Sequence, residues 1–386
     1  MAGSMNNRVE GVVKLQRLVW WFIGVWVCMA SIPGHAEMVT NLYQQSELVV
    51  GQGVEERRQA TAKALASVLV RVSGQPQALN YPEVKAALAN PDSYMEAFRY
   101  ESGNETLERD GEQVPATTVV LNFSQISVEN LLRQSGLPLW PANRPSVLVW
   151  LVTDDLNAGR QMVSLQDNPE LADAIKDEAR ERGLPLVVPL MDLEDQVSLN
   201  ANDLWNLDQS AIASASTRYK PDAVLIGRYS QTSSGRWISA WTLLHKSNRQ
   251  VFDSEGDTDT VLLREAVNST SDYLADIYGI NHRNVASDAV VMDIEPVGEF
   301  SDYVKVLSYL EGLAVVRELN LLALEGNQVR VNLFMDGDIS QLKGALDLDR
   351  RLIPVMTTSS GGSVNMPETL APQGSEQNPL RYSWSG

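Results

Sequence analysis

The first regular pattern of apolar positions predicts a helix over residues 55–73. Five apolar residues recur there at intervals that place them on one helical face: Ala62, Leu65, Ala66, Leu69 and Val72. Gly74 follows at the position of a C-cap. The surrounding pattern predicts strands over 42–50 and 117–123, short helices over 81–89, 93–100 and 127–134, and a loop or hairpin tip over 101–113.

A stretch with three prolines, residues 137–145, separates this first pattern from a second one and predicts a stiff linker. The second pattern alternates apolar strands with helices. Strands are predicted over 147–152, 186–190, 222–227, 237–245 and 249–254, and helices over 169–182, 209–219 and 260–278. Because the last two strands flank a short turn, they form a hairpin, and the predicted sheet is mixed rather than purely parallel.

The third pattern has the order strand, helix, strand, strand, helix, which is typical of a ferredoxin-like unit. The tail is rich in Ser, Gly, Pro and Gln, so it is predicted to be disordered apart from any docking of Tyr382 and Trp384. The predicted fold class is therefore α/β and α+β, multidomain. Its parts are a signal peptide (1–36), an α+β domain (37–136), a mixed-sheet α/β domain (146–280), a ferredoxin-like βαββα unit (288–356) and the tail (357–386).

The first 36 residues have the layout of a cleavable export signal. Basic residues precede an apolar run over 18–32, Pro33 breaks the run, and small residues follow up to Ala36. Cleavage is expected between Ala36 and Glu37, which would leave a periplasmic product without stable membrane insertion. A retained membrane anchor is the alternative, and it fits less well because a span needs about 20 apolar residues.

The net charge and the cysteine content exclude or disfavour several kinds of partner and site. The chain has 31 basic and 49 acidic residues and a formal net charge of −18. Such a field repels phosphates, so nucleic acid and anionic lipid surfaces are disfavoured as partners. The single cysteine, Cys28, lies in the apolar run and would leave with the signal. The mature product would then have no disulfide, no thiolate nucleophile and no cysteine metal site.

Two family resemblances follow from particular residues. The segment 42–50, the end of the first helix over 68–74, and Tyr94 and Tyr100 resemble the bacterial envelope family catalogued as domain of unknown function 2066. The strand 222–228, the strand pair after it and the closing helix resemble the amino-terminal domain of TolB and related lipoprotein activators of peptidoglycan synthases. These resemblances imply a periplasmic, partner-binding role, and they supply no catalytic residues.

The titratable residues were tested for reaction chemistry. His245 and His282 each stand alone in sequence, so a histidine-based metal site or triad is not indicated. The acidic run 253–259 could bind Ca²⁺, but it lacks EF-hand spacing and is better explained as a solvated turn before a helix. The run 340–343 matches Ser-x-x-Lys without its companion motifs, and no phosphate-binding or nucleophile-elbow motif is present. No catalytic residue, cofactor or metal is expected.

One strand carries a candidate binding surface. Period-two alternation places Trp237 and Trp241 on one face of the strand 237–245 and aliphatic residues on the other. If helices cover only the aliphatic face, the tryptophans lie on an open sheet surface with Arg228 nearby, as in many protein interfaces. The alternative is that both faces are buried and the tryptophans belong to the core.

These observations favour a periplasmic protein that binds an unidentified envelope protein and has no enzymatic activity. The alternative is a carboxylate-dependent hydrolase or metal-dependent enzyme that uses Asp154, Asp155 and Asp192. That reading requires the three residues to converge in one cleft and one carboxylate to have a raised pKa. A purely structural scaffold, without a discrete binding face, is the third option.

Overall fold

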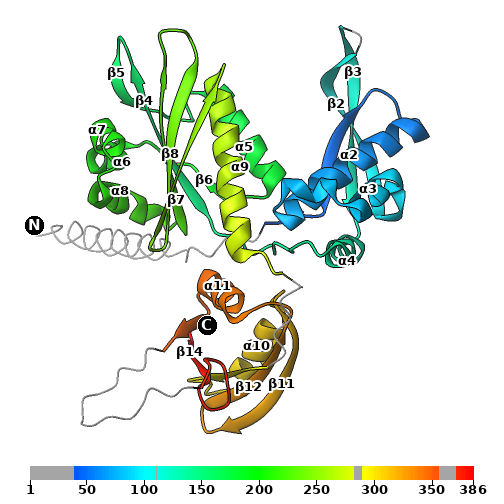
Figure 1. Cartoon of the computed structure of the whole chain (residues 1–386), viewed down its shortest axis with the longest axis vertical. Helices are drawn as coiled ribbons and strands as arrows, with labels where there is room; N and C mark the ends of the chain where they lie inside the picture. The colour runs from blue at the N-terminus through cyan, green and yellow to red at the C-terminus, as the bar shows by residue number, and fades with distance from the viewer. Residues whose placement is uncertain (1–38, 110, 282–288, 356–370) are drawn as a thin grey trace, which may run out of the picture. The chain divides into compact units, whose positions relative to one another are not determined.

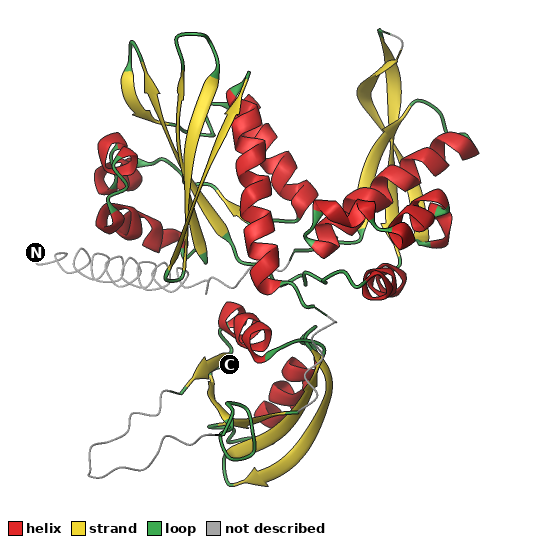
Figure 2. Ribbon diagram, viewed as in Figure 1, coloured by secondary structure: helices red, strands yellow, loops and turns green. Residues whose placement is uncertain are grey.

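The structure, a computed structural model, describes residues 39–109, 111–281, 289–355 and 371–386 (Figure 1). Within these ranges helices and strands occur in comparable amounts (Figure 2). The strands form three separate sheets. The predicted multidomain α/β and α+β class is confirmed. No helix in the same ranges is long and apolar enough to cross a membrane. The predicted signal peptide and its cleavage site at Ala36 and Glu37 lie outside the described residues.

The amino-terminal sheet is antiparallel, in the order β1-β3-β2. Its elements are β1 (Gln44–Val49), α2 (Val54–Ser73), η2 (Pro76–Asn80), α3 (Pro82–Ala89), η3 (Pro91–Ser93), β2 (Met95–Arg109), β3 (Glu112–Phe123) and α4 (Gln125–Ser135). The predicted long helix is confirmed as α2. It has Glu55 and Glu56 in its first turn and ends where Gly74 adopts a φ of 72°, a left-handed conformation that glycine accepts without strain.

The helix predicted over 93–100 is wrong, because β2 and β3 form one long antiparallel ribbon. Of the alternatives for 101–113, the hairpin is confirmed, but most of this stretch is paired strand rather than tip. Their pairing runs from Met95 opposite Phe123 to Arg109 opposite Glu112. Most of β2 is exposed and polar. The sequence therefore lacks the apolar alternation by which a strand is normally detected.

The middle sheet is mixed, as predicted, with the order β5-β4-β7-β8-β9 and with β6 paired to β4. Its strands are β4 (Val147–Asp155), β5 (Gly159–Met162), β6 (Leu186–Val187), β7 (Ala223–Gln231), β8 (Trp237–His245) and β9 (Asn248–Gly256). Its helices are α5 (Pro169–Arg182), α6 (Leu193–Ser198), α7 (Ala201–Trp205), α8 (Gln209–Ser216), η4 (Thr217–Tyr219) and α9 (Asp259–Tyr278). β4 runs parallel to β6 and β7, whereas β7, β8 and β9 form an antiparallel meander.

The two faces of this sheet are covered unequally. The long helices α5 and α9 lie on one face, and the short helices α6, α7 and α8 lie on the other (Figure 1). The core under α5 and α9 includes residues from β4, β7 and β8 and a packed residue from β9. The core under α6 to α8 draws on β4, β7 and the end of β8, and no described residue of β9 belongs to it. The β9 end of that second face is consequently left open.

The carboxy-terminal segment shows the predicted order strand, helix, strand, strand, helix. Its elements are β10 (Val290–Ile294), α10 (Phe300–Glu311), β11 (Val316–Glu325), β12 (Gln328–Met335), α11 (Ile339–Asp349), β13 (Leu352–Pro354) and β14 (Leu380–Trp384). The sheet order is β11-β12-β10-β14-β13. In a ferredoxin-like unit the last strand lies beside the first one, which here is β10. The extra strand β14 takes that place and separates β13 from β10.

The prediction of a disordered tail over 357–386 is wrong for residues 380–384, which form β14. This strand pairs in parallel with β10, with Met292 opposite Leu380 and Ile294 opposite Tyr382. Leu380 and Tyr382 are buried in the carboxy-terminal core, and Trp384 packs against it. The anticipated docking of the two aromatic residues therefore takes the form of a full interior strand.

Three buried arginines join the amino-terminal and middle segments. The side chain of Arg144, at the end of the proline-rich linker, is 0% exposed. Its three nitrogens donate to five backbone carbonyls at 2.8 to 3.0 Å, those of Arg71, Trp140, Pro141, Arg182 and Gly183. Arg71 and Arg182 are buried too and donate across the same junction, to the Glu181 and Gly74 carbonyls respectively. The linker is therefore docked.

Replacing Arg144 by methionine is expected to destabilise the protein. The apolar side chain would leave several buried carbonyls without donors, and each such loss costs about 1–3 kcal/mol. We expect a clear fall in the urea midpoint followed by circular dichroism. Arg236→Met is the control, because Arg236 is exposed and pairs only with exposed Glu255. Equal midpoints for the two variants would contradict the role of Arg144.

Candidate functional site

Of the two alternatives for Trp237 and Trp241, the structure supports the one in which the tryptophans belong to the core, and they do not lie on an open sheet surface. Trp241 is 0% exposed and stacks near Phe252, with ring centroids 6.5 Å apart. Trp237 is partly buried against the same core, beneath α9. The alternation along β8 was predicted correctly, but the long helix covers the tryptophan face rather than the aliphatic one.

A glycine on β7 makes room for this buried tryptophan. Gly227 is paired with Trp241, and a Cβ atom at Gly227 would lie 2.2 Å from Cζ3 of the indole ring. Any larger residue would therefore collide with the ring. The indole Nε1 donates to Ser239 Oγ at 2.7 Å, so the polar edge of the ring is also satisfied inside the protein. Both features mark Trp241 as a core residue.

The opposite face of β8 and β9 carries the exposed apolar residues. Ile238 and Val251 are 43% and 56% exposed. A pocket of about 770 Å³ includes residues of this face and of the α9 side. This face contributes Trp205, Arg228, Ser230, Ile238, Ala240, Asp253 and Glu255, and the α9 side contributes Ser239, Ser254 and Glu265. Arg228, predicted as a partner-binding residue, lines this pocket. It is paired with Ala240, so alternation places it on the face opposite Trp241.

Arg228 is held in place by few contacts for a charged side chain. Its Nη1 donates to the Trp205 carbonyl at 3.0 Å, while its buried Nε has no hydrogen-bond partner among the described residues. Burial lowers the pKa of Arg228, and the nearby positive charge of Arg249 acts in the same direction. Asp253 opposes the shift. The guanidinium is therefore a cation with unused donor capacity beside an apolar surface.

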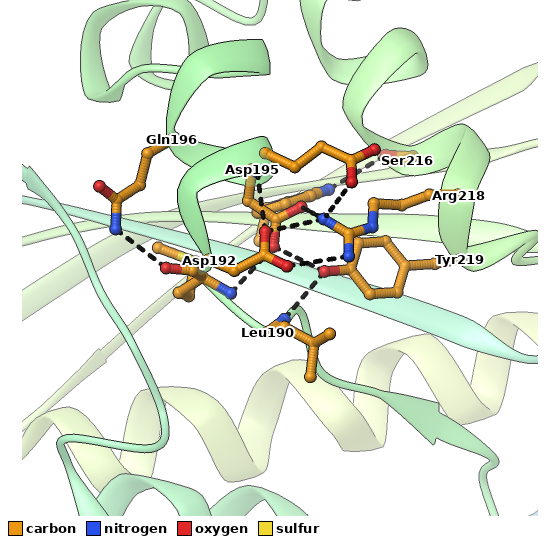
Figure 3. A network of polar contacts seen from close by, with 10 residues as sticks. Leu190, Asp192, Asp195, Gln196, Ser216, Arg218 and Tyr219 are labelled. Carbon is orange, nitrogen blue, oxygen red and sulfur yellow. Dashed lines mark hydrogen bonds and ion pairs between the residues drawn. The ribbon is translucent and has the colours of Figure 1, made fainter. Parts of the chain in front are cut away.

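The aspartate predicted as a rival catalytic residue, Asp192, belongs to a polar network around α6 (Figure 3). Arg218 bridges Asp192 and Asp195, with Nη1 2.8 Å from one carboxylate and 3.2 Å from the other. Tyr219 donates to Asp195 at 2.6 Å and accepts from the Leu190 N–H at 2.9 Å. The hydrogen bond from Arg218 lowers the pKa of Asp192 to about 2. Asp192 therefore stays ionised and serves as an N-cap.

The other two predicted carboxylates also have structural partners. Asp155 accepts from the backbone N–H groups of Asn157 and Ala158, which lowers the pKa of Asp155. Asp154 pairs with Arg160 at 3.2 Å. The pKa of Asp155 and the pKa of Asp192 are lowered, whereas the hydrolase alternative requires a carboxylate with a raised pKa. Among the described aspartates, the pKa of Asp276 is raised, by burial and by Asp272, and this residue lies on α9.

The remaining candidates take ordinary structural positions. His245 is buried at the end of β8, where its Nε2 lies 2.8 Å from the Tyr278 hydroxyl, and His282 lies outside the described residues. The run 253–259 ends β9 and begins α9. Ser340 follows the N-cap Asp338 in the first turn of α11. Across the described ranges, no three acidic, histidine or cysteine side chains gather closely enough to hold a metal ion.

Comparison with known proteins gives little functional detail. Residues 36–141 match a family described as a domain of unknown function (DUF8605). No curated protein matches the chain. A solved structure titled "Crystal structure of uncharacterized protein" is similar at 12% identity, covering 34% of this chain and 97% of that chain with a TM-score of 0.14. The family match supports an uncharacterised domain at the amino-terminal end.

Tyr219→Phe is expected to loosen the network around α6. The substitution removes the donor to buried Asp195 and the acceptor for Leu190 N–H, and losing a hydrogen bond to a charged group costs about 1.5–3 kcal/mol. The urea midpoint should fall accordingly. Tyr303→Phe is the matched control, because no hydrogen bond of the Tyr303 hydroxyl is found in the described residues. A midpoint unchanged in both variants would contradict this assignment.

Stability should fall as the pH drops from 7 to 5, in part because of His245. Burial, helped by the positive charge of Lys246, lowers the pKa of His245, and Asp222 opposes the shift. The unfolded chain therefore binds a proton on His245 more readily than the folded chain does. The stability that neutral His245 contributes is consequently lost as the pH falls below the ordinary histidine pKa of about 6.5. In His245→Gln the change in urea midpoint between pH 7 and pH 5 should be smaller. An identical change would exclude His245 as a cause.

Proposed function

We propose that this chain is an exported bacterial envelope protein that binds another envelope protein and does not catalyse a reaction. The observation that carries the binding proposal is the open face of β8 and β9. There Ile238 and Val251 are exposed beside a pocket that contains Arg228. Exposed apolar residues next to a partly buried arginine are typical of protein interfaces.

The pocket suits one kind of contact on a partner. A carbonyl oxygen could accept from Arg228, whose donors are only partly used. The three acidic residues that line the same pocket would repel a carboxylate. An adjacent apolar side chain could pack on Trp205 and Ile238, which line the same pocket. β9 is also an edge strand of the sheet, so its outer backbone groups are available to an extended segment. A partner segment that offers a carbonyl acceptor and an apolar side chain therefore fits.

The export proposal is supported by the sequence. The first 36 residues have the layout of a signal peptide, and the family match begins at residue 36, where cleavage is expected. The resemblance to domain of unknown function 2066 and to the TolB amino-terminal domain supports a periplasmic location in the same way. The net charge of −18 supports a protein partner over nucleic acid.

Photocrosslinking tests the proposed site. A photoreactive amino acid at Ile238, in cells that make the full chain, should capture one envelope protein. Arg228→Gln should reduce that capture about tenfold, the effect of losing one charge-assisted hydrogen bond of roughly 1.5 kcal/mol. A photoreactive residue at Ile126, which is exposed on α4, is the matched control. The same products from both positions, or none from Ile238, would contradict the proposal.

A further inference from the structure

Helix α6 buries a charged residue and exposes its apolar ones, which is the opposite of an ordinary surface helix. Its one buried residue is an aspartate, Asp195. Its apolar residues face solvent instead: Leu193 and Val197 are 75% and 79% exposed. Residues four apart lie on the same side of a helix, so these two form one stripe, and Leu190 just before the helix is 53% exposed. A surface helix normally buries its apolar face and exposes its charges.

Polar contacts hold this helix in place. Arg218 contacts Asp192 and Asp195, and it also lies 3.4 Å from Glu194. The carboxylate of Asp195 additionally accepts from Tyr219 and from the Met191 N–H at 2.9 Å. The helix thus has a fixed orientation that does not depend on burying Leu193 or Val197. Such an arrangement presents an apolar stripe in a preorganised form.

The charge around the stripe restricts what can cover it. Residues 183–217 contain no lysine, arginine or histidine, whereas their acidic residues are Asp192, Glu194, Asp195, Asp203 and Asp208. Arg218 is the single cation of the network, so it leaves a negative surplus. A second copy would bring like charges together, and an anionic lipid surface would be repelled. Complementarity favours a protein surface in which apolar residues are flanked by lysine or arginine.

We propose that α6 is a second docking surface, which binds a protein segment with apolar side chains flanked by basic ones. Leu193 and Val197 enter the apolar part of the partner, and Asp192 and Glu194 face its basic residues. This surface shares no residue with the pocket at Arg228 and does not rest on the function proposed there. Its partner segment is defined by basic residues, whereas the pocket offers the Arg228 guanidinium to a hydrogen-bond acceptor.

The test is photocrosslinking from Val197 in the full chain, with the crosslinked peptide of the captured protein identified by mass spectrometry. The expected peptide contains apolar residues next to lysine or arginine. Leu193→Ser should reduce capture about tenfold, or about 1.4 kcal/mol of binding free energy, because the apolar contact of the leucine side chain is lost. Ile126→Ser, an exposed substitution on α4, should leave capture unchanged.

Three results would overturn the inference. They are capture of a second copy of this chain, capture that Leu193→Ser does not reduce, and absence of capture from Val197. Because Leu193 is exposed, its serine variant should keep the wild-type urea midpoint, and that measurement separates lost docking from lost folding. Capture from Ile238 without capture from Val197 would reject this inference and leave the pocket proposal intact.

Discussion

The burial of Arg144 is the constraint on which the arrangement of the amino-terminal and middle segments depends. A buried guanidinium is stable only if its donors are used. The carbonyls that accept from it include those of Arg71, in the last turn of α2, and Arg182, the last residue of α5. Helix C-termini carry unpaired carbonyls and partial negative charge, so one cation caps two helices at once. The linker, α2 and α5 must therefore meet at one place.

This junction fixes the start of the middle sheet, and the helices on that sheet determine which part of it stays uncovered. Ser146, two residues after Arg144, accepts the N–H groups of Asp222 and Ala223, which sets β4 beside β7. From there α9 covers β7, β8 and β9 on one face, while the short helices on the other face reach only as far as the end of β8. The open area at β9 is thus a consequence of helix length.

Periodicity predicted the elements that pack in the ordinary way and failed where packing is unusual. α2, α5 and α9 were predicted because their buried residues recur at helical spacing. α6 was missed because its apolar residues point outward, although the N-cap Asp192 was a readable signal. The alternation of residue types along β8 predicted which residues share a face. It does not indicate which of the two faces a helix covers. β14 depends on pairing with β10, far away in sequence, which no local pattern reveals.

Several of the abundant carboxylates have structural roles. A general acid needs a carboxyl group whose pKa is raised. Here several acidic side chains accept hydrogen bonds from backbone N–H groups or arginine: Asp155, Asp192, Asp195 and Asp208. Such contacts stabilise the ionised form, and they lower the pKa of Asp155 and Asp192. The four side chains therefore hold loops and short helices in place through these hydrogen bonds.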